Sequence, residues 1–206
     1  MNNNPHSYAE SFIAEDAVKI AARARGLELG TLDASQGTGA YLRHLAHLLD
    51  AQSVVEIGTG SGVSGLWAFN GAPKDATLTS IDSEREHSAS AKEIFEEAGI
   101  SAQRFRLITG NIIEVVGKLA DSNYDLMIVR SPKDMVDVVQ ESFRLLKDGG
   151  VLLIDNALDG GKVVDPTQRD FETIARRDSI KAIKEDSRWS STLLPIGGGA
   201  LVARKI

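Results

Sequence analysis

The sequence predicts an α/β fold in which a doubly wound, mostly parallel sheet of seven strands is covered by helices. Two observations lead to this prediction. Between residues 53 and 154, short apolar runs alternate with helical stretches, a pattern typical of parallel strands that are buried on both faces. Two further strand-like segments, 192–196 and 200–204, are separated by a short run of glycines. Because so short a turn joins antiparallel strands, we expect a hairpin here, with the last strand antiparallel.

The first five strands are expected where the apolar runs lie, at residues 53–57, 77–81, 105–108, 125–129 and 151–154. Between them, helical periodicity predicts helices at 63–69, 85–98, 112–119 and 135–146. Gly99 and the pair Gly149 and Gly150 stand where helix C-caps are expected. After residue 154 a loop leads to a polar helix, and we interpret its charged residues between 176 and 185 as a solvated face.

The N-terminal 50 residues are expected to form a helical cap on a Rossmann-like core at 51–206, the whole chain of 1–206 being one domain. Tyr8, Phe12, Val18 and Ala21 are spaced along one face of a predicted helix over 7–25. A polar loop follows at 30–39, and apolar residues at helical spacing between 41 and 49 predict the next helix.

Composition excludes several classes of function. The 206 residues contain no cysteine, which excludes disulfides, thiolate metal sites and a cysteine nucleophile. The net charge of −6 opposes binding to nucleic acid. No apolar run approaches the roughly 20 residues of a membrane helix, and the first residues lack the pattern of a signal peptide. We therefore expect a cytoplasmic protein that binds neither nucleic acid nor membrane.

The strongest motif is the segment EIGTGSGVS at 56–64, in which a β-branched run enters a glycine cluster and a helix leaves it. Glycines allow a sharp turn and the close approach of a ligand, and the helix N-terminus offers free N–H groups. Residues 60–65 also fit GxGxxG, and Asp82 follows at the end of the next strand, so an NAD-dependent oxidoreductase is a competing interpretation. Glu56 favours another cofactor, because a carboxylate beside the turn suits a cationic ligand and opposes a pyrophosphate.

The segment EIGTGSGVS resembles motif I of the class I S-adenosylmethionine-dependent O-methyltransferases related to catechol and caffeoyl-CoA O-methyltransferases. The resemblance extends from about residue 35 to 204 and includes TSID at 79–82, EAGI at 97–100, LLKDGGV at 145–151, DN at 155–156 and LLPIG at 193–197. It implies S-adenosylmethionine as cofactor, a sheet whose seventh strand is antiparallel, methyl transfer to an oxygen of a small acceptor such as a phenol, and a homodimer.

Carried onto this chain, the resemblance implies where the cofactor binds. Asp82 would accept the ribose hydroxyls, and Ser64 would bind the methionine carboxylate. Asn111 and Ile112 would border the adenine, and Ala34 would contribute a backbone contact. The full set of implied cofactor-binding residues is Ala34, Glu56, Gly58, Thr59, Gly60, Ser64, Asp82, Ser83, Asn111, Ile112 and Arg130.

The chain departs from the family at its metal site. Metal-dependent members end the fourth strand with a motif of the form Ile-Asp-Ala-Asp-Lys, whereas this chain reads IVRSPK at 128–133 and has Arg130 in place of the first metal-binding Asp. Asp155 and Asn156 keep the other two ligand positions and are expected at the substrate. Because a permanent cation replaces a carboxylate, we predict that no divalent metal binds. Arg130 either substitutes for the charge of the metal or marks a decayed site.

Lys133 matches the general base of the family, which removes the acceptor proton. The predicted catalytic residues are therefore Lys133, Arg130 and Asp155. Methyl transfer from S-adenosylmethionine is the leading interpretation, and two alternatives stay open: an NAD-dependent oxidoreductase, and a protein that binds S-adenosylmethionine without catalysis.

Overall fold

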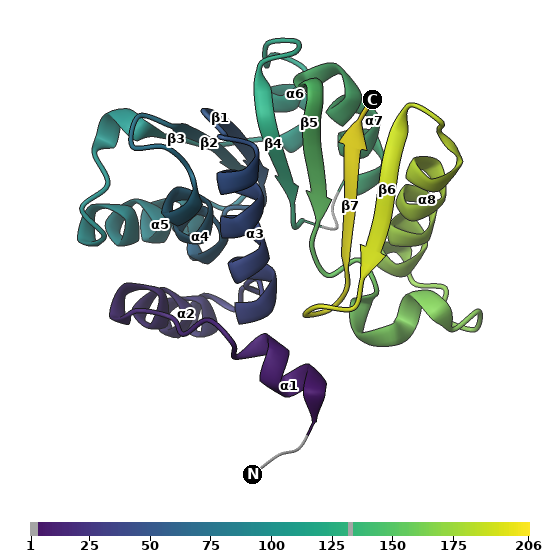
Figure 1. Cartoon of the computed structure of the whole chain (residues 1–206), viewed down its shortest axis with the longest axis horizontal. Coiled ribbons are helices and arrows are strands. Elements are labelled where there is room, and N and C mark those ends of the chain that lie inside the picture. Colours follow the sequence, from purple (N-terminus) through teal and green to yellow (C-terminus); the bar gives the residue numbers. More distant parts are fainter. Residues whose placement is uncertain (1–3, 132–133) are drawn as a thin grey trace.

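A seven-stranded sheet forms the centre of the protein in a computed structural model that describes residues 4–131 and 134–206 (Figure 1). The strands lie in the order β3-β2-β1-β4-β5-β7-β6, and β7 runs antiparallel to both of its neighbours. This confirms the predicted fold class. The strands are β1 (Ser53–Ile57), β2 (Thr77–Asp82), β3 (Phe105–Thr109), β4 (Tyr124–Val129), β5 (Leu146–Ile154), β6 (Trp189–Leu194) and β7 (Ala200–Lys205).

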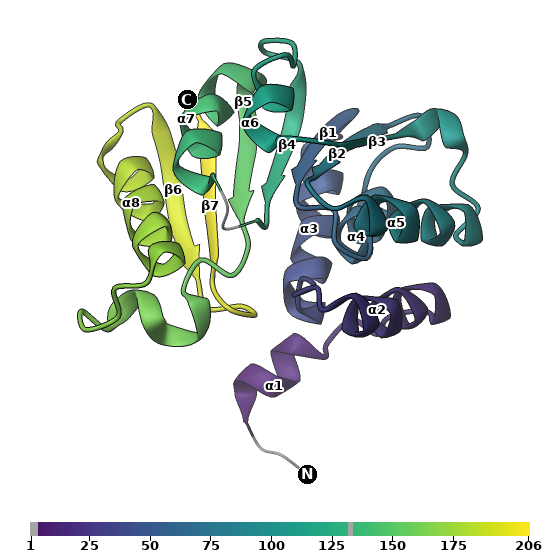
Figure 2. The same cartoon turned by 180° about the vertical axis from the view of Figure 1, so that it is seen from behind.

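Helices cover both faces of the sheet (Figures 1 and 2). The α-helices are α1 (Pro5–Glu10), α2 (Ala17–Leu29), α3 (Gln36–Leu48), α4 (Val63–Gly71), α5 (Arg85–Glu97), α6 (Ile112–Val116), α7 (Met135–Leu145) and α8 (Phe171–Glu185). Two short 3₁₀ helices, η1 (Ala102–Arg104) and η2 (Asp159–Val164), complete the described elements. None of the helices in the described part of the chain is long and apolar enough to cross a membrane.

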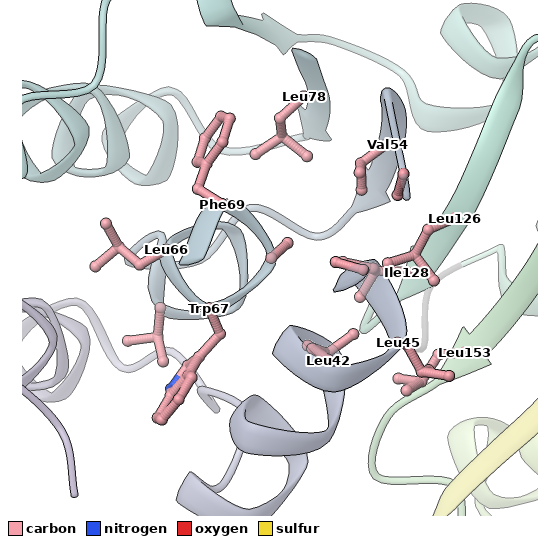
Figure 3. Close-up of a cluster of buried hydrophobic side chains, with 14 of the residues drawn as sticks. Leu42, Leu45, Val54, Leu66, Trp67, Phe69, Leu78, Leu126, Ile128 and Leu153 are labelled. Atoms are coloured by element: carbon pink, nitrogen blue, oxygen red, sulfur yellow. The ribbon is translucent and has the colours of Figure 1, made fainter. Parts of the chain in front are cut away.

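Alternate residues of each strand point to two separate cores. Val54, Leu126 and Ile128 face α3 and α4 in one buried cluster, where Trp67 and Leu42 also lie (Figure 3). The residues that alternate with them along the strands, Val55, Met127 and Val129, face α6, α7 and α8 in the second cluster. The central strand β4 is buried on both faces and apolar at nearly every position, as the sequence pattern predicted, whereas β2 and β6 carry several hydroxyl residues.

The strand register determines where the site forms. Ile57 of β1 pairs with Ile81 of β2 and with Val129 of β4, and Val129 pairs with Ile154 of β5. The carboxyl ends of these four strands are therefore level. The residues that follow them come side by side at one edge of the sheet, which is where open α/β sheets bind ligands.

The N-terminal helix predicted over 7–25 is wrong, because the chain forms two helices with a break at 11–16. Asp16 begins α2 by accepting a hydrogen bond from the backbone N–H of Lys19, and a capping side chain there starts a new helix. Tyr8 and Phe12 do not face a core, since they are 70% and 68% exposed. Gly149 and Gly150 also differ from expectation: α7 ends at Leu145, and both glycines lie within β5.

The carboxylate of Glu10 connects distant parts of the chain. Its Oε1 accepts a hydrogen bond from the N–H of Gly197 (2.6 Å) in the turn between β6 and β7, and its Oε2 accepts one from Gly37 (3.0 Å) in α3. Burial alone would raise the pKa of Glu10, but these hydrogen bonds stabilise the ionised form and lower the pKa below its usual value. Glu10 therefore links α1 to α3 and to the hairpin of β6 and β7 by hydrogen bonds.

Candidate functional site

A cavity of about 360 Å³ opens at the carboxyl edge of the sheet. It is surrounded by the loop before α3, the turn after β1, the ends of β2 and β4, and the segment from η2 to α8. The residues that line it are Gly30, Thr31, Leu32, Gly58, Gly60, Asp82, Ser83, Glu84, His87, Ile112, Arg130, Ser131, Asp159, Glu172 and Arg176.

The glycines in and after the turn that follows β1 serve two purposes: some leave room at the cavity wall, and one allows two helices to pack closely. Gly58 and Gly60 line the cavity with positive φ angles of 93° and 53°. A Cβ on Gly60 would lie 3.2 Å from both Arg130 Nη1 and Asp33 Oδ1, so only glycine leaves this wall open. A Cβ on Gly65 would instead lie 2.6 Å from the ring of Phe95. That glycine allows α4 to pack closely against α5, which is also the role of the third glycine in a GxGxxG fingerprint, so this contact does not separate the two cofactor classes.

Glu56 lies beneath the turn and is fully buried. Its carboxylate accepts hydrogen bonds from the hydroxyls of Ser64 and Ser80, and Ser80 Oγ is 2.7 Å from Thr59 Oγ1. Burial raises the pKa of Glu56, and the positive charge of Arg130 partly opposes this effect. Glu56, Thr59 and Ser64 thus form a polar network that supports the turn, and they are not among the residues that line the cavity.

Asp82, at the end of β2, is bonded directly to the turn. Its Oδ2 accepts a hydrogen bond from the N–H of Gly60 (3.1 Å), and its Oδ1 accepts one from Glu84 (2.9 Å). His87 Nδ1 lies 3.1 Å from the same Oδ1. Each carboxylate oxygen keeps a lone pair for a ligand hydroxyl, as two acceptor oxygens can. Sequence reasoning missed His87, although its position in the first turn of α5 after Asp82 is a signal that could have found it.

The adenine-side residues predicted from the sequence lie close to Asp82. Ile112 is 3% exposed and lines the cavity, as Ser83 does. Asn111 has a structural contact, because its side chain caps α6 by accepting a hydrogen bond from the N–H of Glu114 (3.1 Å). Ala34 is fully buried and does not line the cavity, although its neighbours in the loop before α3 do.

Arg130 forms the floor of the cavity, with a side chain that is 5% exposed. Its guanidinium donates to the carbonyl oxygens of Leu32 and Gly58 and to the hydroxyl of Ser64 (3.3 Å). Two carboxylates flank it: Asp33 Oδ1 is 3.8 Å from Nη2, and Asp155 Oδ2 is 3.6 Å from Nε. Buried Nε has no hydrogen-bond partner among residues 4–131 and 134–206. Sequence reasoning missed Asp33, which also accepts a hydrogen bond from Ser61 Oγ (2.8 Å).

The residues around Arg130 do not fit a divalent cation. Mg²⁺ needs several oxygen ligands, but a guanidinium occupies the space beside Asp155, and Asn156 lies against the turn at Gly198. Within the described ranges, no group of three or more histidine and acidic side chains could hold a metal ion. Lys133, the predicted base, lies outside the described residues, which resume at Asp134.

The segment from η2 to α8 adds residues that the sequence pattern concealed. Arg176 was interpreted as part of a solvated face, and this is wrong, because it is 3% exposed and lines the cavity. Helical periodicity identifies the apolar face of α8 but does not show which charged residue faces inward. Asp159 and Glu172 line the cavity beside it.

Comparisons with known proteins identify the relatives of this chain. Residues 4–206 match the family model described as O-methyltransferase. A protein named as an O-methyltransferase from Mycolicibacterium vanbaalenii is 44% identical over 200 residues, which cover 97% of this chain and 88% of the relative.

Solved structures show the same fold. A protein from Corynebacterium glutamicum superposes with a TM-score of 0.88 at 33% identity, covering 97% of this chain and 94% of the other. The O-methyltransferase TomG from Streptomyces achromogenes, solved with S-adenosylmethionine, has a TM-score of 0.87 at 26% identity, with the same coverage of 97% and 94%. With a family model that matches nearly its whole length, the chain belongs to the O-methyltransferase family.

Proposed function

We propose that the protein transfers a methyl group from S-adenosylmethionine to an oxygen of a small acceptor, for which a phenol is one candidate, without a catalytic metal. The observation that carries the proposal is that one cavity has the glycine turn and Asp82 at one wall and Arg130 at its floor. Family membership supports the reaction type, and TomG, a relative by fold, was solved with S-adenosylmethionine.

The cofactor would bind between the turn and the end of β2. Gly58 and Gly60 leave room for it, Asp82 would accept the ribose hydroxyls, and Ser83 and Ile112 would border the adenine. The buried side chains of Glu56, Thr59 and Ser64 would act mainly by holding the turn. Asn111 and Ala34 would contribute through their backbones. Burial raises the pKa of Glu56 and the residue does not line the cavity, so its charge does not argue against a pyrophosphate as the sequence suggested.

The reaction needs alignment and control of charge. When bound, the cofactor would supply a sulfonium methyl for transfer to the acceptor oxygen, and the electron pair of the C–S bond would stay on sulfur. Arg130, which lines the cavity, would stabilise the negative charge on the acceptor oxygen through the positive charge of its guanidinium, which is the task of the metal in related enzymes. Asp155 would hold the guanidinium in place, and Asn156 would shape the acceptor side. Lys133 stays a prediction for the general base.

Calorimetry with the full chain tests the cofactor and the metal. We expect S-adenosylhomocysteine to bind with 1:1 stoichiometry and NAD not to bind. We also expect Mg²⁺ and Mn²⁺ to give no stoichiometric heat. Stabilisation of the protein by NAD but not by S-adenosylhomocysteine would instead establish the oxidoreductase alternative. Stoichiometric Mn²⁺ binding that disappears in Asp155→Ala would contradict the metal-free site.

A second candidate is cofactor binding without catalysis, which is supported by the fact that Arg130 already contacts several protein groups. It predicts S-adenosylhomocysteine binding with no methylated product from any acceptor. Turnover that survives EDTA and is lost in Arg130→Gln would exclude it.

We further propose a homodimer in the cytoplasm. Support for the dimer comes from Tyr8 and Phe12, which are exposed and lie with their ring centroids 6.3 Å apart beside α1. Light scattering after size-exclusion chromatography tests this: a dimer is expected for the natural chain, and a larger monomer fraction for Tyr8→Ser with Phe12→Ser. Cell fractionation tests the location.

A further inference from the structure

Arg176 on α8 is a buried cation whose hydrogen-bonding groups are not all used. Its Nε donates to the carbonyl oxygen of Asn156 (3.1 Å). Its Nη1 is buried and has no hydrogen-bond partner in the described part of the chain. The nearest carboxylate oxygens are too far for hydrogen bonds, at 3.6 Å for Glu172 Oε2 and 3.8 Å for Asp159 Oδ2. Buried guanidinium groups are normally fully hydrogen-bonded, so this one has capacity for another acceptor.

The two nearby carboxylates differ in how firmly they are held. Asp159 forms an ion pair with a second cation, Lys162, whose Nζ lies 3.3 Å from Oδ2 of Asp159. The side chain of Glu172 is 59% exposed, and it reaches Arg176 from the first turn of the same helix. An exposed glutamate in a loose contact is easily displaced, because solvent compensates its charge. Glu172 therefore occupies a position that another carboxylate could take.

Arg176 lines the same cavity as Arg130, and the two arginines come from separate elements, α8 and the end of β4. Under the proposed function, on which this inference rests, Arg130 lies at the reacting oxygen of the acceptor. A second guanidinium in the cavity then lies where another part of the acceptor would be bound. Guanidinium groups bind carboxylates through two parallel hydrogen bonds.

We propose that the acceptor is a small hydroxy acid whose carboxylate binds Arg176 while its hydroxyl takes the methyl group. Asp159 and Glu172 oppose a dianion such as a phosphate at this position, so a singly charged carboxylate is the favoured group. Under the proposed function, the hydroxyl oxygen would bond to the methyl carbon as the methyl–sulfur bond breaks, S-adenosylhomocysteine would leave with the electron pair, the hydroxyl proton would pass to solvent, and the carboxylate would be unchanged. Arg176 is thus a residue that determines acceptor specificity.

Calorimetry on the full chain saturated with S-adenosylhomocysteine tests this with two matched probes, 3,4-dihydroxybenzoate and its methyl ester. They have the same ring and hydroxyls and differ in charge. We expect the acid to bind at least roughly tenfold more tightly than the ester, the effect of one charge-assisted hydrogen bond. In Arg176→Gln the acid should lose that advantage while the ester keeps its affinity.

Two other variants sharpen the result. Glu172→Gln removes the competing carboxylate and should strengthen binding of the acid but not of the ester. Arg169→Gln is the matched control, since Arg169 is exposed just before α8 and does not line the cavity, and both probes should bind it as they bind the natural chain.

Equal affinities of the two probes in the natural chain, no binding of either, or an equal loss of both in Arg176→Gln would overturn the inference. Binding of S-adenosylhomocysteine is measured first in each variant. If S-adenosylhomocysteine does not bind to the natural chain, the proposed function is overturned. If it binds but the acid is not preferred over the ester, only the role of Arg176 is overturned.

Discussion

Arg130 Nε lies 3.6 Å from Asp155 Oδ2, and both side chains are less than a tenth exposed. Asp33 lies 3.8 Å away on the other side, so the positive charge of the guanidinium offsets the repulsion between two buried carboxylates. Like charges in a buried site repel strongly unless a cation lies between them.

Arg130→Asp should therefore turn the cavity floor into a cation site. Three carboxylates would then face one another, and such a set of oxygen ligands suits Mn²⁺ or Mg²⁺. Calorimetry should detect stoichiometric Mn²⁺ binding in this variant but not in Arg130→Gln, which removes the charge without adding a ligand. Failure of Arg130→Asp to bind Mn²⁺ while it remains folded would show that geometry, and not charge, excludes the metal.

Gly60→Ala should weaken cofactor binding as well as stability. Its φ of 53° costs a residue with a Cβ roughly 1–2 kcal/mol, and the new methyl group would lie 3.2 Å from Arg130 Nη1. Gly99→Ala is the matched control, because Gly99 also has positive φ (72°), but a methyl group there would meet no atom of the described residues within 4 Å. Urea denaturation should show similar losses for both variants, whereas affinity for S-adenosylhomocysteine should fall in Gly60→Ala alone.

Asp82→Ala should reduce the affinity for S-adenosylhomocysteine by roughly 10–100-fold, the effect of losing hydrogen bonds to a charged acceptor. The variant also leaves the N–H of Gly60 without its partner at 3.1 Å. Glu84→Ala serves as the control, since Glu84 lines the same wall through a more exposed side chain. Equal affinities of Asp82→Ala and the natural chain, by calorimetry, would remove Asp82 from the cofactor site.

Glu56→Gln should change how stability depends on pH. The folded-state pKa of Glu56 is raised by burial, so the folded protein holds its proton more tightly than the unfolded chain. The contribution of Glu56 is then fully present below the unfolded pKa and is lost as pH rises through the folded pKa. Relative to the natural chain, Glu56→Gln should be least favourable at about pH 4 and improve toward pH 7, as measured by urea denaturation.

Glu10→Gln should show the opposite trend. Hydrogen bonds from Gly197 and Gly37 lower the pKa of Glu10, so its contribution is present above the unfolded pKa and is lost as pH falls through the folded pKa. The variant should lose stability at neutral pH and approach the natural chain in acid. If Glu10→Gln and Glu56→Gln gave parallel pH profiles, at least one of the two pKa directions would be incorrect.

The sequence predicted those parts of the site that depend on local pattern. Gly58, Gly60 and Asp82 follow buried strands directly, and level strand ends bring them to one edge. Asp33, His87 and Arg176 were missed because their contacts depend on tertiary packing. Arg176 is one charged residue among several on α8, and only the packing of that helix shows that it faces inward.

The fold was predictable for a related reason. Strands β1 and β4 are mostly apolar because both of their faces are buried, and glycines mark the final hairpin, so the seven strands could be found by pattern. The break between α1 and α2 was not found, because the residues on both sides of it favour helix and Asp16 acts as a cap only once the chain turns there. The strand start at Leu146 was missed because Gly149 and Gly150 resemble a helix end.

The bond between Glu10 and Gly197 has a consequence for synthesis of the chain. A ribosome releases residue 10 long before residue 197, so the first helix emerges without the partner that fastens it. The bond from Gly197 can therefore form only after the last hairpin has been made, and a nascent chain halted before Gly197 would leave Glu10 with its partner Gly37 in α3 but without Gly197.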